Sequence, residues 1–165
     1  MENGNKRLEN TKTAINLFYD LKKTYSKEFK HLRNAKIEFR NIKRSFGYCR
    51  VNHTWGEVEK IVLSNDLVNK GDIEEVKETL LHEFGHALDM NKSRHGQGWI
   101  EMCKMIGLEN PTRTATRTYE IDFKYNIYCS ECGQLVAKRH RVTNALRRRY
   151  TSKCCHAKLK VVENA

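Results

Sequence analysis

The segment Glu78-Thr79-Leu80-Leu81-His82-Glu83-Phe84-Gly85-His86-Ala87-Leu88 contains the pattern H-E-x-x-H within a run of apolar residues. On a helix, residues four positions apart lie on one face, so the imidazoles of His82 and His86 can bind a single Zn2+. Glu83 points to the side of that pair and can face a water molecule at the metal. This arrangement is typical of zinc peptidases, and it predicts a helix.

The residues around the motif favour one long, half-buried helix. Asp72 is a good N-cap, and Glu75 follows three positions later. The pair matches a capping box in which Asp takes the place of the usual Ser or Thr. Apolar residues then recur at helical spacing at Ile73, Val76, Leu80, Phe84 and Leu88. We expect this helix to end at about Met90.

A catalytic zinc site uses three protein ligands and leaves one position for water, so a third ligand is needed. His95 is the best candidate, because a short turn after the helix can bring it back over the histidine pair. The glycines on either side of Gln97 let the backbone approach closely. Glu101 and Glu109 are the alternatives, since some zinc peptidases place a carboxylate ligand at about this distance along the chain.

Other segments have periodicities that predict further elements. Apolar residues between positions 9 and 32 recur at helical spacing and predict a first helix. Between positions 36 and 68 the residues alternate instead, which predicts three short strands. Residues 65–71 are expected to form a polar turn and residues 99–106 a short helix, and the alternation over 119–125 predicts a strand.

The C-terminal part of the chain contains a second candidate metal site. Cys129-Ser130-Glu131-Cys132-Gly133 is a C-x-x-C-G pattern, in which the glycine lets the backbone N–H groups turn toward the thiolates. Cys154 and Cys155 follow at nearly the separation of a two-knuckle zinc ribbon, although adjacent cysteines need a distorted turn to bind one metal. We expect the four cysteines to hold a structural zinc. His156 or His140 could replace one of them, and two unrelated thiol pairs are the remaining alternative.

The net charge of +11 is concentrated toward the C-terminus. Residues 112–165 carry 12 Lys and Arg against 4 Asp and Glu, whereas residues 1–111 carry 19 against 16. Concentrated positive charge attracts polyanions through counterion release, so nucleic acid is the first partner to expect, although a solvated face that aids solubility would have the same composition. The candidate phosphate-binding residues are Lys138, Arg139, Arg141, Arg147, Arg148 and Arg149, and Tyr150 could stack on a base.

Length and hydropathy limit the class of protein. The 165 residues suffice for a catalytic domain of about 110 residues and a small added module. No stretch is apolar enough to span a membrane, and residues 1–10 lack the hydrophobic segment of a signal peptide. We therefore expect a monomer in the cytoplasm or nucleus without membrane contact, where six cysteines serve as metal ligands or free thiols rather than disulfides.

Three segments are considered together: H-E-F-G-H at 82–86, H-G-Q-G-W at 95–99, and a C-terminal segment that begins Y-C-S-E-C-G and ends C-H-A-K-L-K. In this order they resemble the SprT-like zinc metalloproteases, the family of Spartan. The resemblance implies an α+β fold, with a zincin-like catalytic domain over residues 1–118 and a β-rich zinc ribbon over 119–165. It also implies that His82, His86 and His95 bind the catalytic zinc and that Glu83 is the catalytic base.

The chain departs from the family pattern at Ser152, where the first cysteine of the final pair is usual, and Cys154 could compensate. Several members of the family act on proteins bound or crosslinked to DNA, which agrees with the basic C-terminal segment. We therefore predict a zinc endopeptidase for DNA-associated proteins, with one catalytic and one structural zinc and with sequence-independent binding of DNA, especially single strands. The alternatives are a nucleic-acid-binding zinc protein with an inactive peptidase-like site, or a zinc hydrolase of a small amide.

Overall fold

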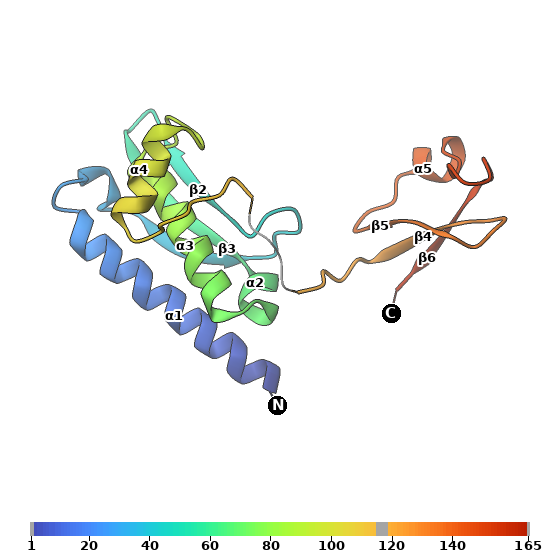
Figure 1. Ribbon diagram of the computed structural model, residues 1–165, viewed down its shortest axis with the longest axis horizontal. Coiled ribbons are helices and arrows are strands. Elements are labelled where there is room, and N and C mark those ends of the chain that lie inside the picture. Colours follow the sequence, from blue (N-terminus) through green and yellow to red (C-terminus); the bar gives the residue numbers. More distant parts are fainter. Residues whose placement is uncertain (1, 115–118, 165) are drawn as a thin grey trace. The chain divides into compact units, whose positions relative to one another are not determined.

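The structure is a computed structural model that describes residues 2–114 and 119–164. The chain forms two compact units, which divide between Glu120 and Ile121 (Figure 1). The first unit combines helices with a three-stranded sheet, and the second is a smaller three-stranded sheet with one short helix. The α+β class expected from the sequence is therefore what the structure has. Among the described residues, no helix combines the length and the apolar character needed to cross a membrane.

The first unit begins with helix α1 (Glu2–Tyr25), which a 3-10 turn at Lys30–Leu32 follows. Three strands come next: β1 (Lys36–Arg40), β2 (Gly47–Asn52) and β3 (Glu57–Ser64). Strand β3 lies in the middle of the sheet, where it pairs in parallel with β1 and antiparallel with β2. Helix α1 ends at Tyr25, about seven residues before the end that the apolar periodicity predicts.

Three helices complete the first unit: α2 (Asn65–Lys70), α3 (Ile73–Leu88) and α4 (Gln97–Met105). The capping box expected for the motif helix is present, with the Asp72 N–H donating to the Glu75 carboxylate at 3.0 Å. The prediction of a polar turn over 65–71 is wrong, because this segment is helical. The Ser64 side chain accepts a hydrogen bond from the Asp66 N–H and so satisfies one of the free donors that start a helix.

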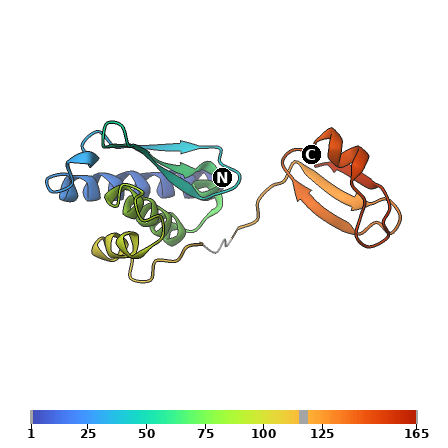
Figure 2. The same ribbon diagram turned by 90° about the horizontal axis from the view of Figure 1, so that it is seen from above.

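Helix α3 is the central element of the first unit. It packs against α1, α4, β2 and β3, and the two views of the ribbon show it among these elements (Figures 1 and 2). The rings of Phe18 on α1 and Phe84 on α3 are both fully buried, and they meet edge to face with centroids 6.1 Å apart. Leu80 and Leu63 are buried in the same core. The motif helix is thus held by apolar contacts with α1 and with the sheet.

Tyr119 does not begin the strand that alternation over 119–125 predicts. It packs against Phe46 of the first unit, with ring centroids 6.0 Å apart. The strand of the second unit begins only at Tyr125.

The second unit is a small antiparallel sheet of β4 (Tyr125–Cys129), β5 (Leu135–Arg139) and β6 (Leu159–Glu163), with β4 in the middle. Ile127 at its centre is 1% exposed, whereas most other side chains of the unit are open to solvent. A six-residue helix, α5 (Asn144–Arg149), begins after Thr143, whose side chain accepts a hydrogen bond from the Leu146 N–H. A small buried centre of this kind gives little hydrophobic stabilisation, so the unit needs another source of stability.

Replacing Phe18 by Ala should lower the unfolding free energy of the first unit by about 3–5 kcal/mol, since a fully buried ring is lost. Urea unfolding followed by far-ultraviolet circular dichroism measures the change. Trp55→Ala is the matched control, because that side chain is 77% exposed and its loss should cost no more than about 0.5 kcal/mol. Equal losses for the two variants would contradict the assignment of Phe18 to the core.

Candidate active site and metal centres

The structure brings the three histidines predicted as zinc ligands together. His82 and His86 lie one turn apart on α3, and His95 lies between α3 and α4. The Nε2 atom of His95 is 3.2 Å from Nε2 of His82 and 3.2 Å from Nε2 of His86. Tetrahedral zinc with Zn–N bonds of about 2.0–2.1 Å would hold its nitrogens roughly 3.3 Å apart. The spacing of the three Nε2 atoms therefore fits one zinc ion.

The protonation of these histidines also suits a metal. Burial, and then the nearby His95, lowers the pKa of His82 to about 4. The pKa of His86 is likewise lowered to about 4, chiefly by burial, and that of His95 is lowered by burial and by Arg113. The three imidazoles are therefore neutral near pH 7, which is the form that binds metal.

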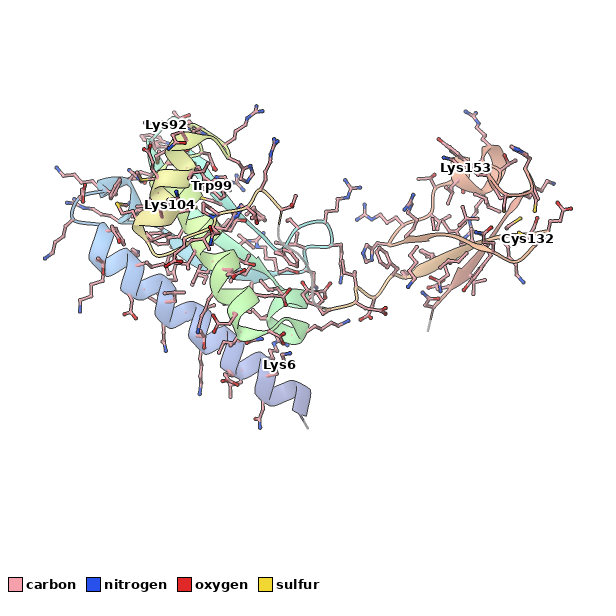
Figure 3. The ribbon with its side chains drawn as sticks, in the orientation of Figure 1. Lys6, Lys92, Trp99, Lys104, Cys132 and Lys153 are labelled. Atoms are coloured by element: carbon pink, nitrogen blue, oxygen red, sulfur yellow. The ribbon has the colours of Figure 1, made fainter. Side chains whose placement is uncertain are left out.

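The ring of Trp99, a residue of α4 that Figure 3 labels, forms one wall of the histidine site. Its centroid lies 4.7 Å from that of His82 and 4.8 Å from that of His95, and it stacks on His86 with an interplanar angle of 27°. The Trp99 side chain is 1% exposed, and its Nε1–H donates to the His82 carbonyl at 3.3 Å. A Cβ on Gly85 would overlap the Cys103 sulfur and lie 3.2 Å from Trp99 Nε1, which explains the glycine in H-E-F-G-H.

Glu83 is buried next to strand β2, with 8% of its surface exposed. The backbone N–H of Cys49 donates a hydrogen bond to the Glu83 carboxylate. Burial raises the pKa of this carboxyl to about 8, while the hydrogen bond from Cys49 acts in the opposite direction. A carboxyl with a pKa in this range can both accept and donate a proton near neutral pH.

Residue 47 of β2 must be glycine, chiefly because the backbone of β3 lies too close for a Cβ, and Glu83 also lies near. A Cβ there would lie 2.7 Å from the Val62 carbonyl oxygen and 3.2 Å from Cγ of Glu83. The Cys49 carbonyl, on the same strand, accepts from Nδ2 of Asn91 at 3.3 Å. The motifs of the sequence do not include Gly47 or Cys49, so their contacts with the site are a finding of the structure.

The carboxylates considered as alternatives to His95 are not part of the histidine cluster. Glu101 and Glu109 are exposed, and Glu101 accepts a hydrogen bond from Gln97 at 3.0 Å. Within the described part of the chain, the group of candidate metal ligands at this site consists of His82, His86 and His95.

The second unit contains the other candidate metal site. Four Sγ atoms lie within 4.8 Å of one another, those of Cys129, Cys132, Cys154 and Cys155. Four thiolates at about 2.3 Å from zinc would lie roughly 3.8 Å apart, so this cluster fits a structural zinc. His156 and His140 are not in the cluster; His140 stacks on Phe123 with centroids 4.6 Å apart.

A tight turn lets the adjacent cysteines take part in one site. The Ser152 N–H donates to the Ala157 carbonyl at 2.8 Å, and the Ala157 N–H donates to Oγ of Ser152 at 3.2 Å. The same hydroxyl is 3.2 Å from Sγ of Cys129. The pKa of the Cys129 thiol is lowered to about 6, chiefly by this contact with Ser152. Ser152 therefore contacts one of the candidate ligands.

The basic residues of the second unit do not all share one face. Lys138 pairs with Asn126 and Arg139 with Tyr125, and successive residues of a strand point to opposite faces. Arg141 is exposed, and the exposed residues Arg147–Arg149 form the last turn of α5. Tyr150 follows α5 and is 60% exposed.

The H-E-x-x-H motif on α3 brings two histidines together with a third histidine from the loop after the helix. This arrangement defines the class of three-histidine metal sites. The chain belongs to the SprT-like family, which matches it over residues 14–120. The family that the motifs indicate is thus confirmed. Among solved structures, the chain is similar to the metallopeptidase zymogen abylysin of Pyrococcus abyssi, with 25% identity over 53% of this chain and 76% of that chain, and a TM-score of 0.37. A comparison with curated proteins found no match.

Replacing His95 by Ala should remove the zinc of the histidine site and leave that of the cysteine site, because the two sets of ligands lie in different units. Metal analysis after dialysis should then show one zinc fewer per chain than in the wild type. Glu101→Ala is the control, and it should keep the wild-type zinc content because its carboxylate is exposed and outside the cluster. Loss of zinc in Glu101→Ala but not in His95→Ala would overturn this set of ligands.

Proposed function

We propose that this protein is a zinc-dependent endopeptidase that cleaves proteins associated with DNA, including crosslinked ones. The observation that carries the proposal is the convergence of three imidazole nitrogens next to a buried glutamate on the same helix. Membership of the SprT-like family supports it, because the resemblance implies the same ligands and the same base.

In the proposed reaction, His82, His86 and His95 would hold the metal through Nε2, and Glu83 transfers the proton. When bound, zinc polarises the scissile carbonyl and lowers the pKa of a water molecule toward about 7. Glu83 takes a proton from the attacking water and passes it to the leaving amine. The place of Glu83, buried beside the two histidines of the same helix, supports this role.

Replacing Glu83 by Gln should lower kcat/KM for a protein substrate by about 10²–10⁴-fold, because the amide cannot accept the proton. Zinc content should stay at the wild-type level. Fragments of a denatured protein on a gel give the rate. Glu78→Gln is the matched control on the same helix, since Glu78 is exposed, and it should cleave like the wild type. A wild-type rate for Glu83→Gln would show that Glu83 is not the base.

The second unit supports association with DNA through its exposed basic side chains. Arg147, Arg148 and Arg149 are consecutive and exposed at the end of α5, with the exposed Tyr150 directly after them. Arginine contacts to phosphate position a protein without reading bases, and an exposed aromatic ring can stack on the bases of a single strand. We therefore propose binding that is independent of sequence and favours single-stranded DNA.

Replacing Arg147, Arg148 and Arg149 together by Glu should weaken binding to a single-stranded oligonucleotide and make it less dependent on salt. The slope of log K against log salt should become less steep by up to about 2, at about 0.7 for each lost phosphate contact. Fluorescence anisotropy at several salt concentrations measures both effects. The control is a triple variant of the first unit in which three exposed lysines, Lys12, Lys23 and Lys27, are replaced by Glu. It has the same change of charge and should keep most of the DNA affinity. If both triple variants bind like the wild type, the basic segment is only a solubilising face.

One experiment separates the peptidase from a zinc protein that only binds nucleic acid. The zinc-loaded protein is incubated with a basic DNA-binding protein, with and without single-stranded DNA, and fragments are followed on a gel. Fragments that require His95 support the proposed activity. Absence of fragments from protein that carries zinc at the histidine site would favour the binding protein instead.

A further inference from the structure

We propose that Asp89 and Ser93, together with the backbone N–H of Trp99, form a clamp that positions His95 and thereby sets the zinc affinity of the histidine site. The inference rests on the proposed zinc site and adds positioning residues that neither the sequence motifs nor the family pattern identifies.

His95 needs such positioning because regular secondary structure does not fix it. His82 and His86 are held by α3, whereas the segment between Leu88 and Gln97 has no regular structure. Three non-glycine residues in this segment, Met90, Asn91 and Arg94, have positive φ angles of 56°, 56° and 53°. Asn adopts this conformation readily, but it is unfavourable for Met90 and Arg94 and persists there only where the surroundings impose it.

The clamp consists of three short hydrogen bonds. The carboxylate oxygen Oδ2 of Asp89 accepts from the Ser93 N–H at 2.8 Å and from the Ser93 hydroxyl at 2.8 Å. The same hydroxyl accepts from the Trp99 N–H at 2.8 Å. One serine side chain therefore joins the end of α3 to the first turn of α4, and His95 lies on the short loop between the joined residues.

The residue at the far end of the clamp contacts all three candidate ligands. The Trp99 ring packs against His82, His86 and His95, so fixing its backbone also fixes the wall on which the imidazoles lie. The loop itself is closed further by the Gly96 N–H, which donates to the Ser93 carbonyl at 2.8 Å. The clamp thus determines both the path of the His95 loop and the surface behind it.

The clamp also explains the second glycine of H-G-Q-G-W. A Cβ at Gly98 would lie 3.0 Å from Oδ1 of Asp89 and 3.0 Å from Oγ of Ser93. These are the two side chains of the clamp, so a larger residue at 98 would push them apart. Gly98→Ala is therefore expected to disturb the clamp without touching a histidine.

A purely structural role for Asp89 and Ser93, as partners that end α3, would affect folding but not metal affinity in the folded protein. The test is therefore the zinc affinity of the histidine site in the full chain, measured by competition with a chelating dye. The His95→Ala variant gives the contribution of the cysteine site, which is subtracted.

Ser93→Ala should weaken zinc binding at the histidine site by about 10–100-fold, the range found for residues that orient metal ligands. Ser93→Thr keeps the hydroxyl and should restore most of the affinity. Lys92→Ala is the matched control in the same loop, because Lys92 is exposed and lies outside the clamp. Asp89→Ala, which removes the accepting oxygen, and Gly98→Ala supply further tests should Ser93→Ala fail to fold.

Wild-type affinity in Ser93→Ala, or an equal loss in Ser93→Thr and Ser93→Ala, would overturn the clamp. Wild-type affinity in Asp89→Ala and Gly98→Ala would do so as well. These results leave the proposed function intact, since the wild type would still bind zinc through His95. A wild-type protein whose zinc content does not depend on His95 would instead overturn the proposed function itself.

Discussion

The burial of the apolar stripe of α3 is the constraint on which the first unit depends. Val76, Leu80 and Phe84 recur every four residues and pack into the core shared with α1 and the sheet, which fixes the rotation of the helix about its axis. His82 lies two residues from both Leu80 and Phe84, or about 200° around the helix, so the histidine pair points away from that core. Helix α4 covers this second face and brings Trp99 against the histidines. The apolar residues therefore set the direction in which the candidate metal ligands point, although they are not part of the histidine cluster.

The sequence predicts the parts of the site that depend on spacing along the chain. His82, Glu83 and His86 follow from the motif on a helix, and the capping box that starts this helix was also readable from Asp72 and Glu75. The contacts of Glu83 with β2 were not predictable, because they require the antiparallel pairing of β2 with β3 and the packing of both strands on α3. The role of Trp99 as a wall was hidden for the same reason, since its place in the motif does not show which rings it contacts.

The errors of sequence interpretation have local physical causes. The turn expected before α3 is the helix α2, because one serine hydroxyl at its start satisfies a backbone donor that composition does not reveal. Tyr119 continues an alternating pattern with residues 121–125 but packs on Phe46, since a single partly buried aromatic ring produces the same apolar signal as a strand. Lys138 and Arg139 are neighbours in sequence, yet the pleat of β5 separates them. Charge counted along the chain therefore overstates the charge on any one surface.

The hydrogen bond from strand β2 to Glu83 has a consequence for how the site tolerates amino-acid change. Every amino acid except proline has a backbone N–H, so many residues at position 49 could orient the carboxylate as Cys49 does. Two positions earlier the situation is reversed, because Gly47 leaves no room for any side chain. The position of the Glu83 carboxylate is thus encoded in the path of a strand, and its sequence record is one obligatory glycine two positions before Cys49.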